Sequence, residues 1–272
     1  MQMNLIQKYQ NKLELLREKT PLIHHLTNVV TMNDCANITL ALGGSPVMAH
    51  SLAEAPQMAE WANAIVLNMG TPEPDFIEAM ILAAQVAKRK KVPVVFDPVG
   101  AGATPFRQQI ALRLIKEVKP DIIKGNLAEI RFLAGMVSSQ RGVDSLDTSD
   151  EAGEAVLEAA KQYNCVVVAT GKTDTFSDGK TVLKLEGGSP WLTKITGTGC
   201  MTSSLVGCFA AVHDDPLQAS IWGVAAMKLA GEIAAKRLKK HEGTATYRGY
   251  VIDAISRLTE KSLTLEKRIT VC

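Results

Sequence analysis

Residues 92–103 of the 272-residue chain, Val-Pro-Val-Val-Phe-Asp-Pro-Val-Gly-Ala-Gly-Ala, join an apolar run to a glycine-rich loop. An apolar run without polar alternation is typical of a parallel strand that is covered on both faces of its sheet. Helical spacing follows the loop, from about Pro105 to Glu117. The segment therefore predicts a strand–loop–helix unit of a parallel α/β fold, with Asp97 at the carboxyl end of the strand.

The alternation of strand and helix continues on both sides of this unit. Apolar runs predict strands at 22–26, 64–68, 121–124 and 165–170, and a hairpin turn at Asp178-Gly179 leads into a strand at 180–185. Helical periodicity predicts helices at 32–42, 75–90, 149–163, 200–212, 217–238 and 247–261, and the polar residues 137–147 predict an exposed loop. We predict a three-layer α/β/α fold with a mainly parallel central sheet, in one domain over residues 1–272.

Composition narrows the class of protein. The apolar fraction of 46% and the charged fraction of 21% allow a sizeable core, and a net charge of +2 gives no broad nucleic-acid surface. No 18-residue apolar span and no apolar signal-peptide core occur, so we expect no membrane segment. The five cysteines lack zinc-site spacing, which favours a reducing, cytoplasmic location; they are Cys35, Cys165, Cys200, Cys208 and Cys272.

Polar motifs follow several of the predicted strands, at the point where each strand ends. The motifs are Asn68-Met-Gly-Thr, Asp97-Pro-Val-Gly, Lys124-Gly-Asn and Thr170-Gly. Ligands of parallel α/β sheets bind beyond the carboxyl ends of the strands. The sequence therefore predicts one ligand site along this edge of the sheet.

A glycine-rich turn, Thr196-Gly-Thr-Gly-Cys200, opens a long apolar helix. Free N–H groups and the helix dipole make such a start suitable for a phosphate, although no Gly-Lys-Ser/Thr of a P-loop follows. A helix N-terminus also favours the thiolate form of a cysteine, so Cys200 is a candidate acceptor for a hydroxyl proton. The alternatives are a turn that serves helix packing and a small buried thiol, which is what we expect of Cys208.

Charged and polar residues at the other strand ends suit a nucleotide and its metal. Asp97 and Glu129 are candidate Mg²⁺ ligands, directly or through water, with a turn residue and a helix-dipole acid as the alternatives. Lys124 is a candidate partner for ATP phosphates, and the Thr170 hydroxyl is a candidate donor to a phosphate oxygen or a turn cap. Met48 is a candidate wall for a flat heteroaromatic ring, or simply a core residue.

Together these motifs resemble the hydroxyethylthiazole kinase family, which belongs to the ribokinase-like kinases. They occur in the family's order over residues 22 to about 212, and it is their spread that makes the resemblance specific. The matching stretches are Leu26-Thr-Asn-Val-Val30, Ala41-Leu-Gly-Gly-Ser-Pro-Val-Met48, Leu67-Asn-Met-Gly-Thr71, Asp97-Pro-Val-Gly-Ala-Gly-Ala103, Lys124-Gly-Asn126 with Glu129, Thr170-Gly171 and Thr196-Gly-Thr-Gly-Cys200.

The resemblance implies an activity and a set of site residues. The activity is transfer of the γ-phosphate of ATP, with Mg²⁺, to the hydroxyl of 4-methyl-5-(2-hydroxyethyl)thiazole in thiamine biosynthesis and salvage, by a homotrimer with sites between subunits. Cys200 would be catalytic. The resemblance implies nucleotide contacts by Lys124, Thr170 and Asn126, substrate contacts by Met48, Gly197 and Asn28, and metal contacts by Asp97 and Glu129.

Three departures from the family pattern and three rival functions stay open at the level of sequence. Gly44 stands where alanine is common, Thr198 stands where alanine is usual, and Lys124 stands where arginine, with its bidentate fork, is also found. The rivals are a ribokinase-like kinase for hydroxymethylpyrimidine or pyridoxal, a repair dehydratase for hydrated nicotinamide nucleotides on the same fold, and a non-catalytic thiazole-binding protein. Cys200 and the Gly43-Gly-Ser-Pro-Val-Met48 stretch count against the first rival.

Overall fold

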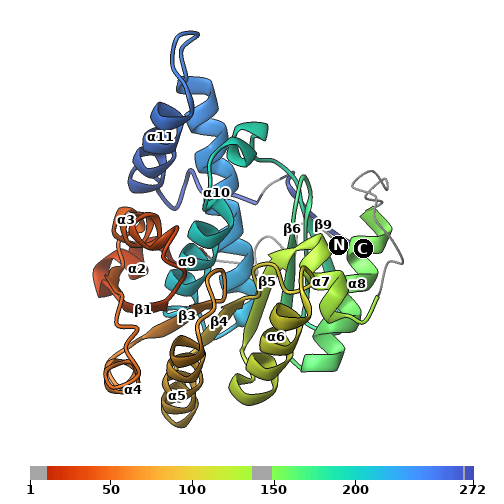
Figure 1. The fold of residues 1–272 in the computed structure, drawn as a ribbon. Helices are drawn as coiled ribbons and strands as arrows, with labels where there is room; N and C mark the ends of the chain where they lie inside the picture. The colour runs from red at the N-terminus through yellow and green to blue at the C-terminus, as the bar shows by residue number, and fades with distance from the viewer. Residues whose placement is uncertain (1–10, 137–148, 266) are drawn as a thin grey trace.

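The computed structural model describes residues 11–136, 149–265 and 267–272 (Figure 1). A sheet of nine strands runs through this part of the chain in the order β2-β1-β3-β4-β5-β6-β7-β8-β9. Strands β2 to β6 pair in parallel, and β6 to β9 pair antiparallel. The strands are β1 Leu22–Leu26, β2 Ser45–Val47, β3 Ala64–Asn68, β4 Val94–Asp97, β5 Ile122–Asn126, β6 Val166–Thr170, β7 Asp174–Ser177, β8 Val182–Leu185 and β9 Ile269–Val271.

Helices cover both faces of the sheet, as the predicted three-layer fold requires (Figure 1). One buried apolar cluster joins the sheet to α2, α3, α9, α10 and α11, and a second joins it to α4 through α8. The helices are α2 Leu13–Lys19, α3 Met32–Leu42, α4 Ala55–Ala59, α5 Pro74–Lys90, α6 Pro105–Val118, α7 Leu127–Leu133, α8 Ser149–Tyr163, α9 Thr198–Ala210, α10 Pro216–Arg237 and α11 Thr244–Ser256, with a short 3₁₀ helix η1 at Pro190–Lys194.

The apolar continuity of the central strands has a direct cause in this layering. Ala64 and Val66 of β3 lie in the first cluster, whereas Ile65 and Leu67 lie in the second. Successive side chains of a strand point to opposite faces, so both faces need apolar residues when helices cover both. This is why the sequence of β3 shows no polar alternation.

Most predicted elements are confirmed within a few residues, and the differences have simple reasons. The helix predicted for 247–261 ends at Ser256, although Leu258 continues its apolar spacing and is buried beyond the helix end. Ser45–Val47, where the sequence analysis predicts no strand, forms strand β2 at the sheet edge, where Pro46 is tolerated. The loop predicted at 137–147 lies outside the described residues.

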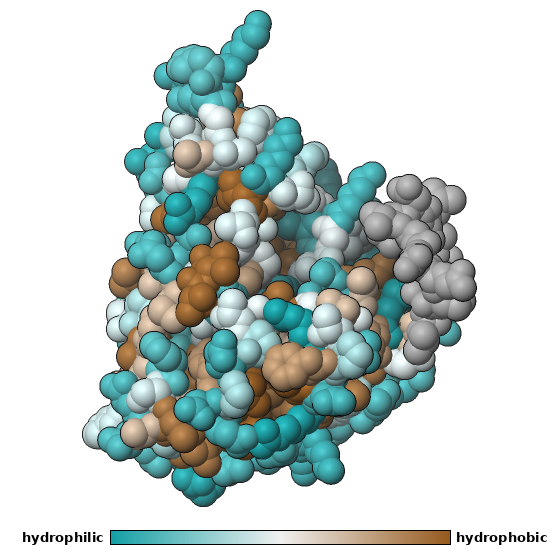
Figure 2. Space-filling model, viewed as in Figure 1, coloured by the Kyte–Doolittle hydropathy of each residue, from teal (hydrophilic) through white to brown (hydrophobic). Residues whose placement is uncertain are grey.

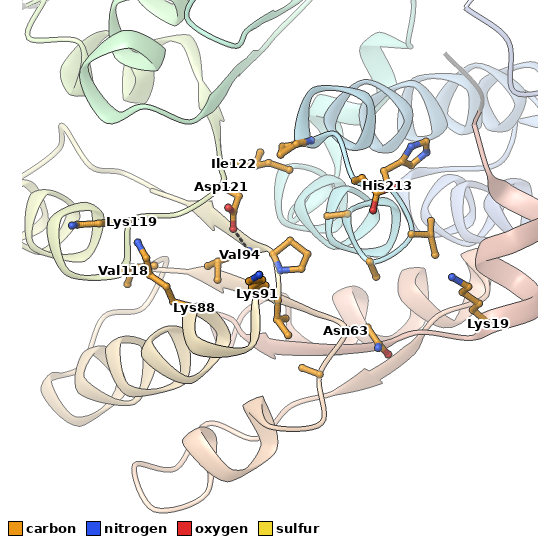
Figure 3. Close-up of a pocket in the computed structure, with 18 residues that line it drawn as sticks. Lys19, Asn63, Lys88, Lys91, Val94, Val118, Lys119, Asp121, Ile122 and His213 are labelled. Carbon is orange, nitrogen blue, oxygen red and sulfur yellow. Dashed lines mark hydrogen bonds between the residues drawn. The ribbon is translucent and has the colours of Figure 1, made fainter. Parts of the chain in front are cut away.

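A hollow of about 630 Å³ lies at the amino ends of the parallel strands, on the edge opposite to the predicted ligand site (Figure 3). Its walls include Lys88, Lys91 and Lys119. These lysines lie at the C-terminal ends of α5 and α6, where positive charge complements the helix dipole. The helix dipole is a sufficient reason for lysines at these positions, and no ligand is needed to explain them. The predicted ligand site lies at the opposite edge of the sheet.

Candidate active site

The N-terminus of α9 meets the carboxyl ends of the central strands. Its N-cap, Gly197, has φ 83°, a left-handed conformation that favours glycine. A Cβ atom there would lie 2.7 Å from Cγ2 of Thr31, so the glycine also permits a close approach to the loop after β1. This contact brings two predicted substrate residues, Gly197 and Asn28, to the same corner of the site.

Cys200 lies in the first turn of α9, as predicted, and its side chain is half-buried. Its sulfur accepts hydrogen bonds from two side-chain amides, Nδ2 of Asn68 at 3.3 Å and Nδ2 of Asn28 at 3.4 Å. Asn68 ends β3 and Asn28 follows β1, which are neighbouring strands. Three segments that are far apart in the sequence therefore meet at the sulfur atom.

Asp97 at the end of β4 is buried, with 1% of its surface exposed. Its Oδ2 atom accepts hydrogen bonds from Oγ of Ser203 at 2.6 Å and from Nδ2 of Asn68 at 3.0 Å, and it lies 3.3 Å from Nζ of Lys124. A buried carboxylate is stable only when it is paired and hydrogen-bonded, and these partners meet that condition. The predicted turn role at Asp97-Pro98 therefore does not account for the side chain.

Lys124 on β5 is also buried, with 2% exposure, so it is not a surface lysine that simply closes the strand. Its ammonium group donates to the carbonyl oxygen of Gly199 at 3.0 Å, in the first turn of α9. Burial by itself lowers the pKa of Lys124, but the neighbouring Asp97, Cys200 and Glu129 outweigh that effect and raise the pKa above its ordinary value. The lysine thus keeps a positive charge beside the helix start.

Glu129 forms a capping box at the start of α7. Its Oε2 accepts from the backbone N–H of Asn126 at 2.7 Å, and its Oε1 accepts from that of Gly100 at 2.8 Å. The pKa of Glu129 is raised, first by burial and then by the charge of Asp97. The charge of Asp97 thus disfavours the charged form of Glu129. A bound divalent cation would relieve this repulsion.

The acidic pair supplies carboxylate oxygens, which are the ligands that Mg²⁺ takes from proteins. In the described parts of the chain no three His, Cys, Asp or Glu residues gather as a metal-ligand set. Magnesium usually takes one or two carboxylates and completes its shell with water and substrate phosphates. Asp97 and Glu129 therefore suit a cation that enters with the nucleotide.

The other predicted residues lie at the two ends of the same edge. Thr170 ends β6 opposite Asn126 of β5, and its hydroxyl donates to the carbonyl oxygen of Gly125 at 3.1 Å. The exposed Asn126 uses its side-chain oxygen to cap α7. Met48 is half-buried and follows β2, on the far side of β1. The predicted nucleotide and substrate residues are thus separated, with Cys200 and Asp97 between them.

Sequence reasoning left two residues of this centre without a role. Asn68 was part of a quoted motif, and its register with Asp97 follows from the parallel pairing of β3 with β4. Ser203 follows Cys200 by three residues, a spacing that places both on one face of a helix. The alignment of strand ends is therefore the sequence signal for Asn68, and the three-residue helical spacing is the signal for Ser203.

Thr198, one of the departures from the family pattern, does not turn its hydroxyl toward the helix start. Its Oγ1 donates to the carbonyl oxygen of Leu192 at 3.2 Å, in η1. This hydrogen bond satisfies the Thr198 hydroxyl. The threonine side chain therefore contacts the preceding 3₁₀ turn.

Comparison with solved structures shows that the fold is ribokinase-like. The pyridoxal kinase from Staphylococcus aureus in complex with AMP-PCP and pyridoxal has a TM-score of 0.58 and 16% identity, covering 78% of this chain and 87% of that chain. That likeness shows the fold alone. Among the described helices, none is both long enough and apolar enough to span a bilayer.

Within that class, the chain belongs to the hydroxyethylthiazole kinase family, whose family model matches residues 13–261. The hydroxyethylthiazole kinase of Alkaliphilus oremlandii is 46% identical over 252 residues, which are 92% of this chain and 93% of the relative. That of Methanocorpusculum labreanum is 44% identical, over 97% and 99% of the two chains. The solved hydroxyethylthiazole kinase protein from Pyrococcus horikoshii has a TM-score of 0.87 at 34% identity and covers all of both chains. The family predicted from the motifs is confirmed.

Proposed function

We propose that the chain transfers the γ-phosphate of ATP to the hydroxyl of 4-methyl-5-(2-hydroxyethyl)thiazole, a step of thiamine biosynthesis and salvage. Family membership supports this proposal, and one geometric observation carries it. The open N-terminus of α9, with Cys200 in its first turn, adjoins the buried Asp97–Lys124 pair. An anion site, a proton acceptor and a charged pair thus meet at one point.

Each part of this centre has a role in phosphoryl transfer. Backbone N–H groups of residues 197–200 receive the negative charge of the transferred group, assisted by the helix dipole. The Cys200 sulfur accepts the proton of the substrate hydroxyl. The transition state of phosphoryl transfer is loose in most analyses, so a modest base is sufficient. The charged Lys124 lies beside the same helix turn and balances phosphate charge.

The two ends of the site suit the two substrates. Asn28, Gly197 and Met48 would hold the thiazole alcohol on the β1–β2 side. On the β5–β6 side, Thr170 and Asn126 would bind the nucleotide. Lys124 would contact the phosphates between the nucleotide end and the thiazole end of the site. Asn126 uses its side-chain oxygen as a helix cap, so its amide group is the part that we assign to a ligand.

Mg²⁺ at Asp97 and Glu129 would neutralise phosphate charge and orient the donor. We predict that Asp97→Asn and Glu129→Gln each raise the Mg²⁺ concentration for half-maximal activity about tenfold or more, because each removes a charged oxygen. The measurement is a magnesium titration at saturating ATP. Glu117→Gln, a change on the surface of α6, is the control. Titrations of the two site variants that overlay the parent's would contradict the metal assignment.

The assembly and location complete the proposal. We propose a homotrimer with sites between subunits, a single domain that the continuous nine-stranded sheet of the described residues supports, and a cytoplasmic location. All five cysteines are free thiols, as a reducing compartment maintains them. The residue-level support for a trimer is the exposed apolar pair Val29 and Val30, which directly follows Asn28 on the substrate side of the site.

The direct test is mass detection of thiazole phosphate after mixing the purified protein with Mg·ATP and the thiazole alcohol. Hydroxymethylpyrimidine and pyridoxal compete in the same mixture, and ADP release is followed in parallel. We expect the thiazole phosphate as the main product. Phosphorylation of a competing alcohol alone, repair of a hydrated nicotinamide nucleotide alone, or thiazole binding without a phosphate product would each overturn the proposal in favour of a rival.

A further inference from the structure

The two amides at the Cys200 sulfur have orientations that their other partners fix. Oδ1 of Asn68 accepts from the backbone N–H of Gly70 at 2.9 Å and from Nδ2 of Asn28 at 2.8 Å. Rotating the Asn68 amide by half a turn would direct its NH₂ group at the Gly70 N–H and its oxygen at the Asp97 carboxylate. Both contacts would be repulsive, so the NH₂ group of Asn68 faces Asp97 and Cys200.

Asn28 is oriented in the same way. Its Oδ1 accepts from the backbone N–H of Thr31 and from the Thr31 hydroxyl, each at 3.1 Å. The backbone N–H is a donor only, so the NH₂ group of Asn28 points away from it, toward Asn68 and Cys200. Neither orientation depends on an assumption about the state of the sulfur.

All four amide hydrogens then have acceptors. Asn68 donates to Oδ2 of Asp97 at 3.0 Å and to Sγ of Cys200 at 3.3 Å. Asn28 donates to Oδ1 of Asn68 at 2.8 Å and to the same sulfur at 3.4 Å. Asn68 is fully buried, and Asn28 has 4% exposure. The sulfur therefore accepts two hydrogen bonds from amides whose orientations are fixed by their other partners.

We propose that Asn68 is a positioning residue of the kinase site, which together with Asn28 holds the Cys200 sulfur as a hydrogen-bond acceptor facing the substrate hydroxyl. The inference rests on the proposed function for the role of Cys200 as proton acceptor. In the step itself, the hydroxyl proton moves to the sulfur as an S–H bond forms. The alcohol oxygen bonds to the γ-phosphorus, and the bond from that phosphorus to ADP breaks. The amides keep all their hydrogens.

Asn68 also connects the proposed proton acceptor to Asp97, because its amide group donates to both. Asn68 and Asp97 are register partners on β3 and β4, so the sheet sets the spacing between the Asn68 amide and the Asp97 carboxylate. The Cys200 sulfur is linked to this pair by the hydrogen bond that it accepts from Asn68. One side chain therefore connects the sheet to the helix that carries the sulfur.

The test compares two variants that each remove one donor from Asp97. Asn68→Ala also removes a donor from the sulfur. Ser203→Ala does not, because the partners of the Ser203 hydroxyl are Asp97 and the Gly199 carbonyl oxygen. The first readout is the rate of Cys200 alkylation by iodoacetamide at pH 7, without ATP or thiazole, followed by peptide mass spectrometry. We expect Asn68→Ala to slow alkylation about tenfold, the order of one hydrogen bond to a charged group, and Ser203→Ala to change it less than twofold.

A second readout does not depend on access of the reagent. The ultraviolet absorbance of the thiolate is taken as the difference between each protein and its Cys200→Ala counterpart. We expect the difference to fall in Asn68→Ala and to persist in Ser203→Ala. Equal alkylation rates and equal thiolate absorbance in the parent and Asn68→Ala would overturn the inference, whatever the activity. If Asn68→Ala does not fold, Asn28→Ala removes the other donor and is held to the same expectation.

Kinetics separate this inference from the proposed function. If the parent makes thiazole phosphate, we expect Asn68→Ala to lower kcat about tenfold while KM for the thiazole stays within twofold, because the amide contacts the sulfur and not the ring. A change in KM alone would overturn the positioning role. Absence of thiazole phosphate from the parent would overturn the proposed function and leave the alkylation result standing as a property of the sulfur.

Discussion

At the scale of single residues, the sulfur of Cys200 has the most specific prediction. Cys200→Ala removes the proposed proton acceptor and keeps the backbone amides of the helix start. We expect kcat to fall about 10²- to 10⁴-fold, the range for a general base, with a much smaller change in KM. A coupled assay of ADP release measures both. An unchanged kcat would remove Cys200 from the mechanism.

Cys208, on the same helix, is the matched control. It is fully buried, and burial raises the pKa of its thiol to about 12. A neutral thiol of this kind acts as a small apolar residue. We expect Cys208→Ala to lower the free energy of unfolding and to leave kcat unchanged, so that loss of a thiol as such is separated from loss of the reacting sulfur.

His25 predicts how stability depends on pH. It is buried on β1, where its Nδ1 pairs with the Ile23 carbonyl oxygen and its Nε2 with the Ser204 hydroxyl. Burial lowers the pKa of His25 from 6.5 to about 4; the Ile23 hydrogen bond partly opposes this effect, and the neighbouring His24 adds a smaller lowering. Below pH 6.5 the unfolded chain takes up a proton that the folded chain does not. We expect the free energy of unfolding to fall as pH drops from 6.5 to 4, by about 3 kcal/mol over the whole window.

Urea unfolding at pH 7 and pH 5 measures this dependence. Exchange of His25 for glutamine removes the titrating group, so we expect a flatter pH dependence from His25→Gln, whatever its effect at pH 7. The exposed His50 is the control, and His50→Gln should keep the parent's slope. Identical slopes for the parent and His25→Gln would contradict the assignment.

At the scale of elements, the crossing of α9 and α10 holds the helix that carries Cys200 in place. A Cβ atom at Gly223 of α10 would lie 2.6 Å from both Cα and N of Val206 in α9. Backbone atoms cannot rotate away, so Gly223→Ala must separate the helices. We expect a loss of about 1–3 kcal/mol in the free energy of unfolding, together with lower kcat, because α9 carries Cys200. Thermal unfolding and the coupled assay measure the two effects.

Gly249 provides the control for the same chemical change. It lies exposed in α11, and a Cβ atom there would meet nothing within 4 Å. Alanine is the better helix former by roughly 0.5–1 kcal/mol, so we expect Gly249→Ala to stabilise the protein slightly. Equal effects of the two variants would show that the close crossing of α9 and α10 does not limit stability.

The elements also show what the sequence could and could not predict. Buried strands such as β3 were predictable because both faces demand apolar residues, whereas three-residue β2 is too short for a periodic signal. Asp97 and Cys200 were predictable because each stands at a recognisable local feature, a strand end and a helix start. The bonds that Asn68 makes to them were not, since they depend on how separate segments pack in space.

At the scale of the whole molecule, apolar side chains remain exposed near the substrate side of the site. Brown patches interrupt the hydrophilic surface in Figure 2 on the side where Figure 1 places α3 and α4. Exposed apolar residues of these and adjoining segments are Val29, Val30, Leu40, Leu52 and Trp61. Exposed apolar surface can mark a contact site between proteins. Val29 follows Asn28 directly, so a second subunit seated here would close the substrate end of the site.

Leu40 tests this arrangement at a distance from the reacting atoms. It is 59% exposed on α3, and a charge there would be buried without a partner in the proposed trimer. We expect Leu40→Glu to shift the solution mass from three times the 29.3 kDa chain toward a single chain, measured by light scattering after size exclusion, and to lower activity most at low protein concentration. Leu112→Glu, on α6 at 47% exposure, is the matched control and should keep the parent's mass and activity. A parent protein that stays monomeric at all concentrations while fully active would contradict both the trimer and the shared site, because the site would then be complete within one chain.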